Sequence, residues 1–269
     1  MKITSRHANA LGCVSGAWRI WALSDGYAEM PANLLKEPDG RVHALPTSLD
    51  RAGAMLRLSV NCYLLQRPDA GSILVDCGAG GSWDPTMGRL EEAMAEAGID
   101  PSSIATVALT HTHSDHINGL LTPDGRELFA SLRRIVIAAD AAPKFRAEKP
   151  LQRFQALLAP IAAGDRVADG VMAVAMPGHA VGHMGYRLST GEDDILFCGD
   201  VIHVHAAQFA RPELTWTSDD NQTVARATRL RLLREAADAG SWLAGAHVDW
   251  PGIGRIDADG QGYAFRPLP

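Results

Sequence analysis

Histidine and aspartate crowd one short stretch of this 269-residue sequence. The segment HTHSDH places four side chains that can bind metal within six residues: His111, His113, Asp115 and His116. It follows the apolar run TVALT, which predicts a buried strand, and residues two apart in a strand project to the same side. His111 and His113 would then point together, and the turn after them can bring Asp115 and His116 alongside. The alternative is a polar turn whose histidines only cap the next helix, which so dense a cluster disfavours.

Three further ligand-type residues stand at the ends of later apolar runs. His179 lies in PGHAVGH, Asp200 in LFCGD and His247 in LAGAH. An aspartate after a glycine is by itself an ordinary turn residue, so the inference depends on the whole set. The seven side chains are enough to hold two metal ions that share one carboxylate. Imidazole and carboxylate ligands suit zinc first, with manganese, iron or cobalt as alternatives.

The segments that must position these residues alternate between strands and helices. Strands are predicted at 18–23, 59–65, 72–75, 106–110, 134–138, 171–176, 184–188, 195–198 and 241–246. One helix is expected from an Asp84 N-cap to a Gly98 stop, and another over 224–239 with Gly240 as its stop. Two β-rich layers with helices packed outside them predict an α/β sandwich. We expect one domain over residues 1–269, with residues 31–57 as a lid over a pocket.

Composition narrows the class of protein. Hydrophobic residues make up 46% of the chain and charged residues 21%, which is typical of a globular protein with a sizeable core. The net charge of −6 disfavours a nucleic-acid partner, because such proteins usually concentrate basic residues. The sequence shows neither a secretory signal nor an apolar segment of membrane-spanning length. Scattered cysteines without a CxxC pair favour reduced, buried thiols, and we expect a cytoplasmic protein with a small-molecule substrate.

Taken in order, HTHSDH, PGHAVGH, CGD and GAH resemble the motifs of the metallo-β-lactamase superfamily. The resemblance extends from about Leu65 to Ile256 and includes the segment VDCGAGG. It implies a four-layer αββα sandwich and a dinuclear metal centre. It assigns the first ion to His111, His113 and His179, the second to Asp115, His116 and His247, and the bridging position to Asp200. It also implies a hydroxide nucleophile shared by the two ions. Asp115 could orient this hydroxide or pass a proton to the leaving group.

The segments GDVIHVHAAQF and GAHVDWPGIGRI further resemble methyl parathion hydrolase and its relatives, which are close to the N-acyl homoserine lactonases. Many lactonases carry a tyrosine three residues after the bridging aspartate, where this chain has His203. That histidine can still donate a hydrogen bond to a developing oxyanion or protonate an alkoxide. A packing histidine beside the metal centre is an equally weighted alternative. The resemblance therefore implies a hydrolase of small esters, lactones or phosphotriesters, in a family whose members are often homodimers.

Other functions remain open. A thioester hydrolase of the glyoxalase II type and a single-iron persulfide dioxygenase share HxHxDH and GHxxGH, but glyoxalase II adds a C-terminal helical domain, and only about twenty residues follow His247. A non-enzymatic metal-binding protein on the same scaffold would usually have gaps in its ligand set.

Several residues near these motifs are expected to be structural. His183 should form structural hydrogen bonds, His205 should contact solvent or a loop, and Cys198 should lie in the core. Three aromatic residues could line an apolar pocket, with core or surface packing as the default: Trp83, Phe209 and Trp250.

Overall fold

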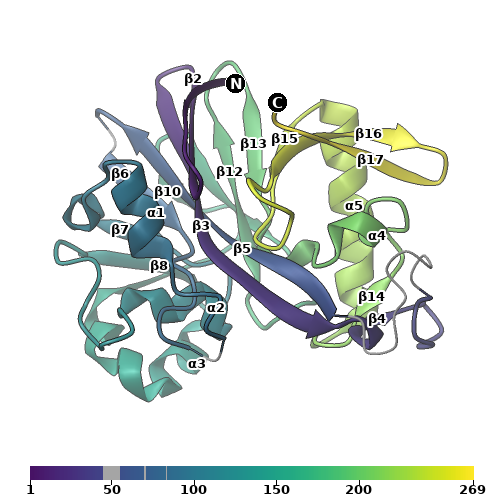
Figure 1. Ribbon diagram of the computed structural model, residues 1–269, viewed down its shortest axis with the longest axis horizontal. Coiled ribbons are helices and arrows are strands. Elements are labelled where there is room, and N and C mark those ends of the chain that lie inside the picture. The colour runs from purple at the N-terminus through teal and green to yellow at the C-terminus, as the bar shows by residue number, and fades with distance from the viewer. Residues whose placement is uncertain (45–54, 70, 83) are drawn as a thin grey trace.

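The computed structural model describes residues 1–44, 55–69, 71–82 and 84–269. Its strands form two large sheets and one small one (Figure 1). The first sheet holds, in chain order, β1 (Lys2–Arg6), β2 (Ala10–Ser15), β3 (Trp18–Pro31), β5 (Met55–Arg67), β6 (Gly71–Val75), β7 (Thr106–Ala108), β8 (Arg134–Ala138) and β9 (Leu158–Ile161). The second holds β10 (Arg166–Ala168), β11 (Val171–Ala175), β12 (Met184–Ser189), β13 (Asp194–Phe197), β15 (Trp242–Ala244), β16 (Ile253–Asp259) and β17 (Gly262–Pro267). In both sheets this is also the order of the neighbouring strands, and β4 (Leu35–Lys36) pairs separately with β14 (Thr215–Trp216).

Helix α1 flanks the first sheet and helix α5 flanks the second (Figure 1). The α-helices are α1 (Leu90–Glu96), α2 (Ser114–Ile117), α3 (Ala142–Ala147), α4 (His205–Gln208) and α5 (Gln222–Ala239). Short 3-10 helices occupy Ala32–Leu34, Pro101–Ser103, Asn118–Leu120, Lys149–Leu157 and Gly199–Val201. No helix in the described part of the chain is long and apolar enough to cross a membrane.

The main hydrophobic core lies between the two sheets. Apolar side chains of β3 and β5 meet those of β12 and β13 in one buried cluster, for example Ile20 and Leu64 with Tyr186 and Phe197. A second cluster packs α5 against the outer face of the second sheet. Burial on both faces explains the nearly continuous apolar runs of the central strands. The predicted αββα sandwich is confirmed.

Several predicted boundaries are wrong: the strand predicted over 18–23 continues to Pro31, the one over 59–65 begins at Met55, and the one over 241–246 ends at Ala244. Two further errors have clear physical reasons. The first helix begins at Leu90 rather than just after Asp84, because Gly88 adopts a left-handed conformation with φ +79° that interrupts the helix. Its Gly98 stop is confirmed, with φ +67°. The strand predicted over 106–110 ends at Ala108, since the Thr110 N–H donates to the Asp76 carboxylate at 2.7 Å instead of to a neighbouring strand.

The segment 31–57 is not one continuous flap in its described parts. Pro31 ends β3, and Met55 begins β5 directly opposite it in the sheet. Between them, β4 pairs with β14. Residues 45–54 of the proposed lid lie outside the described residues.

Asp25 holds the loop before α1 onto the first sheet. It sits at a register shift between β3 and β5, and its buried carboxylate accepts hydrogen bonds from the N–H groups of Ala79, Gly88 and Leu90 at 2.8, 3.1 and 2.9 Å. Burial raises the pKa of Asp25 from 3.8 to about 6, although these hydrogen bonds oppose the shift. The folded protein therefore binds a proton at Asp25 more tightly than the unfolded chain does.

We expect the wild-type protein to gain stability relative to Asp25→Asn as the pH falls from 6 to 4, because only wild type takes up this proton. The gain should be lost again as the pH rises through 6, and its full size is roughly 3 kcal/mol. Urea unfolding of both proteins between pH 4 and 7 measures it. The exposed Asp238→Asn serves as control, and a pH-independent difference between wild type and Asp25→Asn would contradict the prediction.

Candidate metal centre

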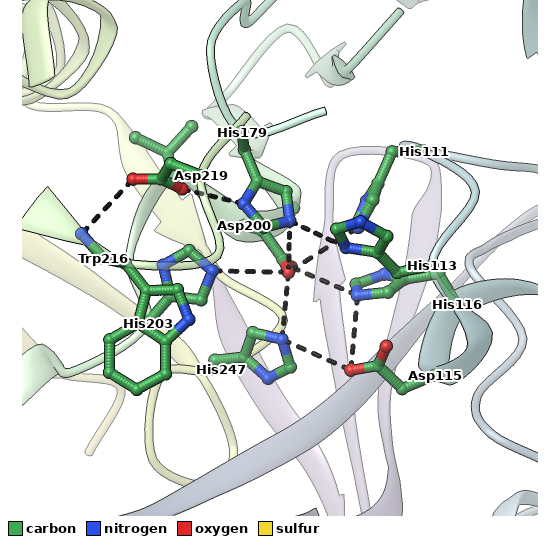
Figure 2. A network of polar contacts seen from close by, with 12 residues as sticks. His111, His113, Asp115, His116, His179, Asp200, His203, Trp216, Asp219 and His247 are labelled. Atoms are coloured by element: carbon green, nitrogen blue, oxygen red, sulfur yellow. Dashed lines mark hydrogen bonds and ion pairs between the residues drawn. The ribbon is translucent and has the colours of Figure 1, made fainter. Parts of the chain in front are cut away.

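The predicted ligands come from five chain segments that end at the same edge of the sandwich. His111 and His113 follow β7, Asp115 and His116 lie on α2, and the other three residues follow strands of the second sheet: His179 after β11, Asp200 after β13 and His247 after β15. Figure 2 shows their side chains converging on the Asp200 carboxylate. His111 and His113 lie beyond the end of β7, yet their ring centroids are only 4.5 Å apart.

Asp200 lies at the centre of this cluster. Its Oδ2 is 3.1 Å from His179 Nε2 and 3.1 Å from His247 Nε2, and its Oδ1 is 3.2 Å from His116 Nε2. His111 Nε2 lies 3.7 Å from Oδ2. Asp115 Oδ2 is 3.5 Å from His247 and 3.6 Å from His116. The structure thus brings all seven predicted ligands together.

The side chains divide into two groups whose ligand atoms all lie within 4.8 Å of one another. One group is His111, His113, His179 and Asp200, and the other is Asp115, His116 and His247. Several of their buried atoms form no hydrogen bond within the described residues: His111 Nε2, His116 Nε2 and Asp200 Oδ1. Buried polar atoms are normally satisfied. Unsatisfied nitrogen and oxygen atoms that face one another are what a divalent cation would need, so these residues fit a two-metal site.

In three of the histidines, a hydrogen bond from Nδ1 holds the ring so that Nε2 points towards Asp200. His116 Nδ1 donates to Asp76 at 2.8 Å, His179 Nδ1 to Asp219 at 2.8 Å, and His247 Nδ1 to the Ser59 carbonyl at 2.7 Å. Such contacts fix the tautomer and the orientation of a metal-binding imidazole. In each case Nε2 is the atom that faces Asp200.

The histidines and aspartates of the cluster shift one another's pKa values. Burial alone would raise the pKa of Asp200, but the surrounding histidines, His116 and His247 foremost, hold it well below its ordinary value. Burial opposes the charged form of His116, yet Asp200, Asp115 and Asp76 outweigh it and raise the pKa of His116 well above 6.5. Burial lowers the pKa of His111 well below 6.5. Asp200 is therefore an ionised carboxylate at the centre of the site.

A cavity of about 280 Å³ opens onto the cluster. Its polar lining includes Asp115, Asp200, His113, His179 and His247, and its apolar lining consists of Ala28, Met30, Leu58 and Trp216. Among the described residues that line this cavity, none is a lysine or an arginine. The cavity therefore suits a compact, uncharged ligand.

His203 also lines this cavity. Its ring is buried, stacks on Trp216 with centroids 5.2 Å apart, and lies with Nε2 3.6 Å from Asp200 Oδ2. Neither ring nitrogen forms a hydrogen bond within the described residues. Burial lowers the pKa of His203 to about 4, so the ring is neutral near pH 7. This histidine is placed to donate to a bound ligand.

The residues expected to be structural are found in structural positions. His183 Nε2 accepts from the Asp200 N–H at 3.3 Å, and His205 lies partly exposed with Nε2 3.5 Å from Asp249. Cys198 is buried with a free thiol, as are the other three cysteines. Phe209 stacks on Phe265, and Trp250 packs against the main core. Trp83 lies outside the described residues.

Sequence reasoning missed three residues of the site. Asp76 and Asp219 support ligand histidines, and Trp216 forms a wall of the cavity. Asp76 is the one non-glycine residue with a positive φ, +55°, among the described residues. Its position in VDCG, after a strand, was a local signal. Asp219 and Trp216 lie in TWTSDD, which resembles an ordinary polar turn.

Comparison with known proteins identifies the class. Residues 55–247 match the family model of the metallo-beta-lactamase superfamily, and the chain belongs to this superfamily. It is 29% identical over 143 residues to hydroxyacylglutathione hydrolase of Vibrio cholerae, which covers 52% of this chain and 46% of that protein. The chain thus spans about half the length of the curated relatives it matches.

Solved structures share the fold over nearly the whole chain. AidC, a dizinc quorum-quenching lactonase solved with a product, superimposes with a TM-score of 0.85 at 20% identity and covers 97% of this chain and 98% of its own. AbOPH, a hydrolase in the beta-lactamase superfamily, gives a TM-score of 0.84 at 27% identity, with 98% and 99% covered. The relatives named here are hydrolases, and this chain carries a histidine–aspartate cluster of metal-binding type.

Proposed function

We propose that the protein is a dinuclear metal-dependent hydrolase of small, uncharged esters, lactones or phosphotriesters. The observation that supports it most is the Asp200 carboxylate, whose two oxygens contact histidines of both ligand groups. His111, His113 and His179 would hold one ion, Asp115, His116 and His247 the other, and Asp200 both. Zinc suits this set of nitrogen and oxygen donors, and manganese, iron and cobalt accept it too. When bound, two divalent ions lower the pKa of water towards neutrality and polarise a substrate oxygen.

The chain's own residues would bind the substrate, orient the nucleophile and transfer protons. The apolar wall of Met30, Leu58 and Trp216 would bind the acyl, aryl or alkyl part of the substrate and exclude water from it. Asp115, at the rim of the cluster, would orient the nucleophile or pass its proton to the leaving group. His203 would donate a hydrogen bond to the substrate oxygen that becomes negative as the bond breaks.

A thioester hydrolase is the second candidate, because the Vibrio cholerae relative is a hydroxyacylglutathione hydrolase. Glutathione conjugates are anionic, and among the described residues around the cavity no lysine or arginine would neutralise them. A buried, unpaired charge costs roughly 3 kcal/mol or more, which corresponds to about a hundredfold in rate. We therefore expect neutral substrates to be preferred over hydroxyacyl-glutathione by about that factor.

Metal analysis of the purified protein combined with a substrate panel tests this proposal. The panel contains an aryl ester, an N-acyl homoserine lactone, an aryl phosphotriester and a hydroxyacyl-glutathione; the lactone is included because AidC, which shares the fold, is a lactonase. Two transition-metal ions per chain and turnover of a neutral member support the proposal. One iron with oxygen consumption, preference for the glutathione thioester, or two bound ions without any turnover would each overturn it.

A further inference from the structure

Arg229 of α5 is a fully buried cation outside the ligand cluster. Its guanidinium donates from Nε to the Val201 carbonyl at 2.7 Å and from Nη1 to the Pro212 carbonyl at 3.2 Å and to the Leu214 carbonyl. Its Nη2 lies 3.8 Å from Asp219 Oδ2. One side chain thus joins three carbonyls and one carboxylate of the segment 201–219, which follows β13 and includes α4 and β14.

Two of these contacts lead directly to predicted metal ligands. Val201 is the residue after Asp200, so the hydrogen bond to its carbonyl fixes the backbone that carries the central carboxylate. The other oxygen of Asp219 accepts from His179 Nδ1 at 2.8 Å. Arg229 therefore contacts the residue that follows Asp200 in the chain, and it contacts the carboxylate that holds His179.

The same face of α5 is tightly docked on the His179 turn. A Cβ atom at Gly178 would lie 2.1 Å from the Ala225 backbone nitrogen, so this glycine permits the close approach. The N–H of Asn221, the N-cap of α5, donates to the Gly178 carbonyl at 2.9 Å. Thr228, the neighbour of Arg229, donates through Oγ1 to the Pro177 carbonyl at 2.7 Å. The helix thus forms a rigid support behind His179.

A purely structural role does not require a charged side chain at this position. Apolar residues of similar volume often replace an entire buried ion pair without loss of stability, so stability alone does not account for the pair of Arg229 and Asp219. A guanidinium offers a fork of donors in fixed geometry, which can hold several acceptors in register at once. The acceptors here all belong to the segment 201–219, which carries the support of His179 and the cavity wall Trp216.

We propose that Arg229 is a positioning residue that orients His179 chiefly through Asp219, with a smaller contribution to Asp200 through the Val201 carbonyl, and so sets the affinity of the ion held by His111, His113 and His179. This inference rests on the proposed two-metal function. Residues hydrogen-bonded directly to a metal ligand, as Asp219 is to His179, typically contribute 10- to 100-fold to metal affinity, and this range bounds the effect expected of Arg229 acting through Asp219.

The test measures zinc affinity directly, by competition with a colorimetric zinc chelator, on wild type, Arg229→Met, Arg229→Lys, Asp219→Asn and the double variant Arg229→Lys with Asp219→Asn. Arg234→Met, at an exposed position of the same helix, is the matched control. We expect one of the two zinc ions to bind at least about tenfold more weakly in Arg229→Met, and the other to change less than about twofold. Because Arg229 is proposed to act largely through Asp219, the double variant should bind zinc little more weakly than Asp219→Asn alone.

The outcomes separate this inference from the proposed function. A lower melting temperature with unchanged zinc affinity, or losses that add in full in the double variant, would overturn the positioning role. Arg229→Lys keeps the charge and the approximate length, so it carries the test if Arg229→Met does not fold. Fewer than two zinc ions in wild type would overturn the proposed function, and this inference with it.

Discussion

Replacing Asp200 with asparagine is expected to lower hydrolysis by roughly 1,000-fold or more and to remove at least one of the two bound ions. The carboxylate contacts His179 and His247 through Oδ2 and His116 through Oδ1, so it belongs to both ligand groups. An amide has no net charge to offset two neighbouring divalent cations, whose mutual repulsion then weakens both sites. Metal content by mass spectrometry and kcat/KM for the best substrate of the panel measure the two effects.

Asp238→Asn is the matched control for this substitution, because Asp238 lies exposed near the end of α5. It should retain both ions and full activity. An Asp200→Asn protein that keeps two ions and a tenth or more of its activity would contradict the bridging role of Asp200.

The convergence of the candidate ligands was predictable because each of them lies where its strand or turn ends. Imidazoles clustered in HTHSDH are rare outside metal sites, and the strand ends that precede His179, Asp200 and His247 were visible as apolar runs. A sheet brings the ends of its strands to a common edge, so the sequence already implied that these residues meet. Their distances from Asp200 confirm this.

The residues that support the ligands were less predictable, because their roles depend on contacts far apart in the chain. Asp219 contacts His179, which lies 40 residues earlier, and Asp76 contacts His116, which lies 40 residues later. An isolated aspartate after a strand or in a turn has many ordinary explanations. Only the folded structure distinguishes the two that orient an imidazole.

The error at the start of the first helix has the same origin. Asp84 followed by Pro85 is a strong local signal for a helix N-terminus. The Leu90 N–H is instead satisfied by Asp25, 65 residues earlier, and the Gly88 conformation prevents the helix from starting sooner. A long-range hydrogen bond thus overrides the local preference.

Replacing His203 with phenylalanine is expected to lower kcat by about 100-fold while both metal ions stay bound, a loss typical of one missing donor to a developing oxyanion. The phenyl ring is flat and can still stack on Trp216, but it is one ring atom larger than imidazole and lacks both nitrogens. Those nitrogens are buried, form no hydrogen bond within the described residues, and belong to a ring that lines the cavity. They are therefore free to serve the substrate.

His205→Phe is the matched control, since His205 is two residues away, partly exposed, and contacts Asp249 rather than the ligand cluster. It should leave kcat and metal content unchanged.

The two explanations left open by the sequence, a donor to the substrate and a packing residue, predict different results for His203→Phe. If His203 is only a packing residue, His203→Phe should keep its kcat within about threefold of wild type even where the larger ring lowers the melting temperature, because an aromatic ring still stacks on Trp216. If His203→Phe instead loses an ion, His203 is a metal ligand with His179 and Asp219, with which its ligand atoms form a third compact group.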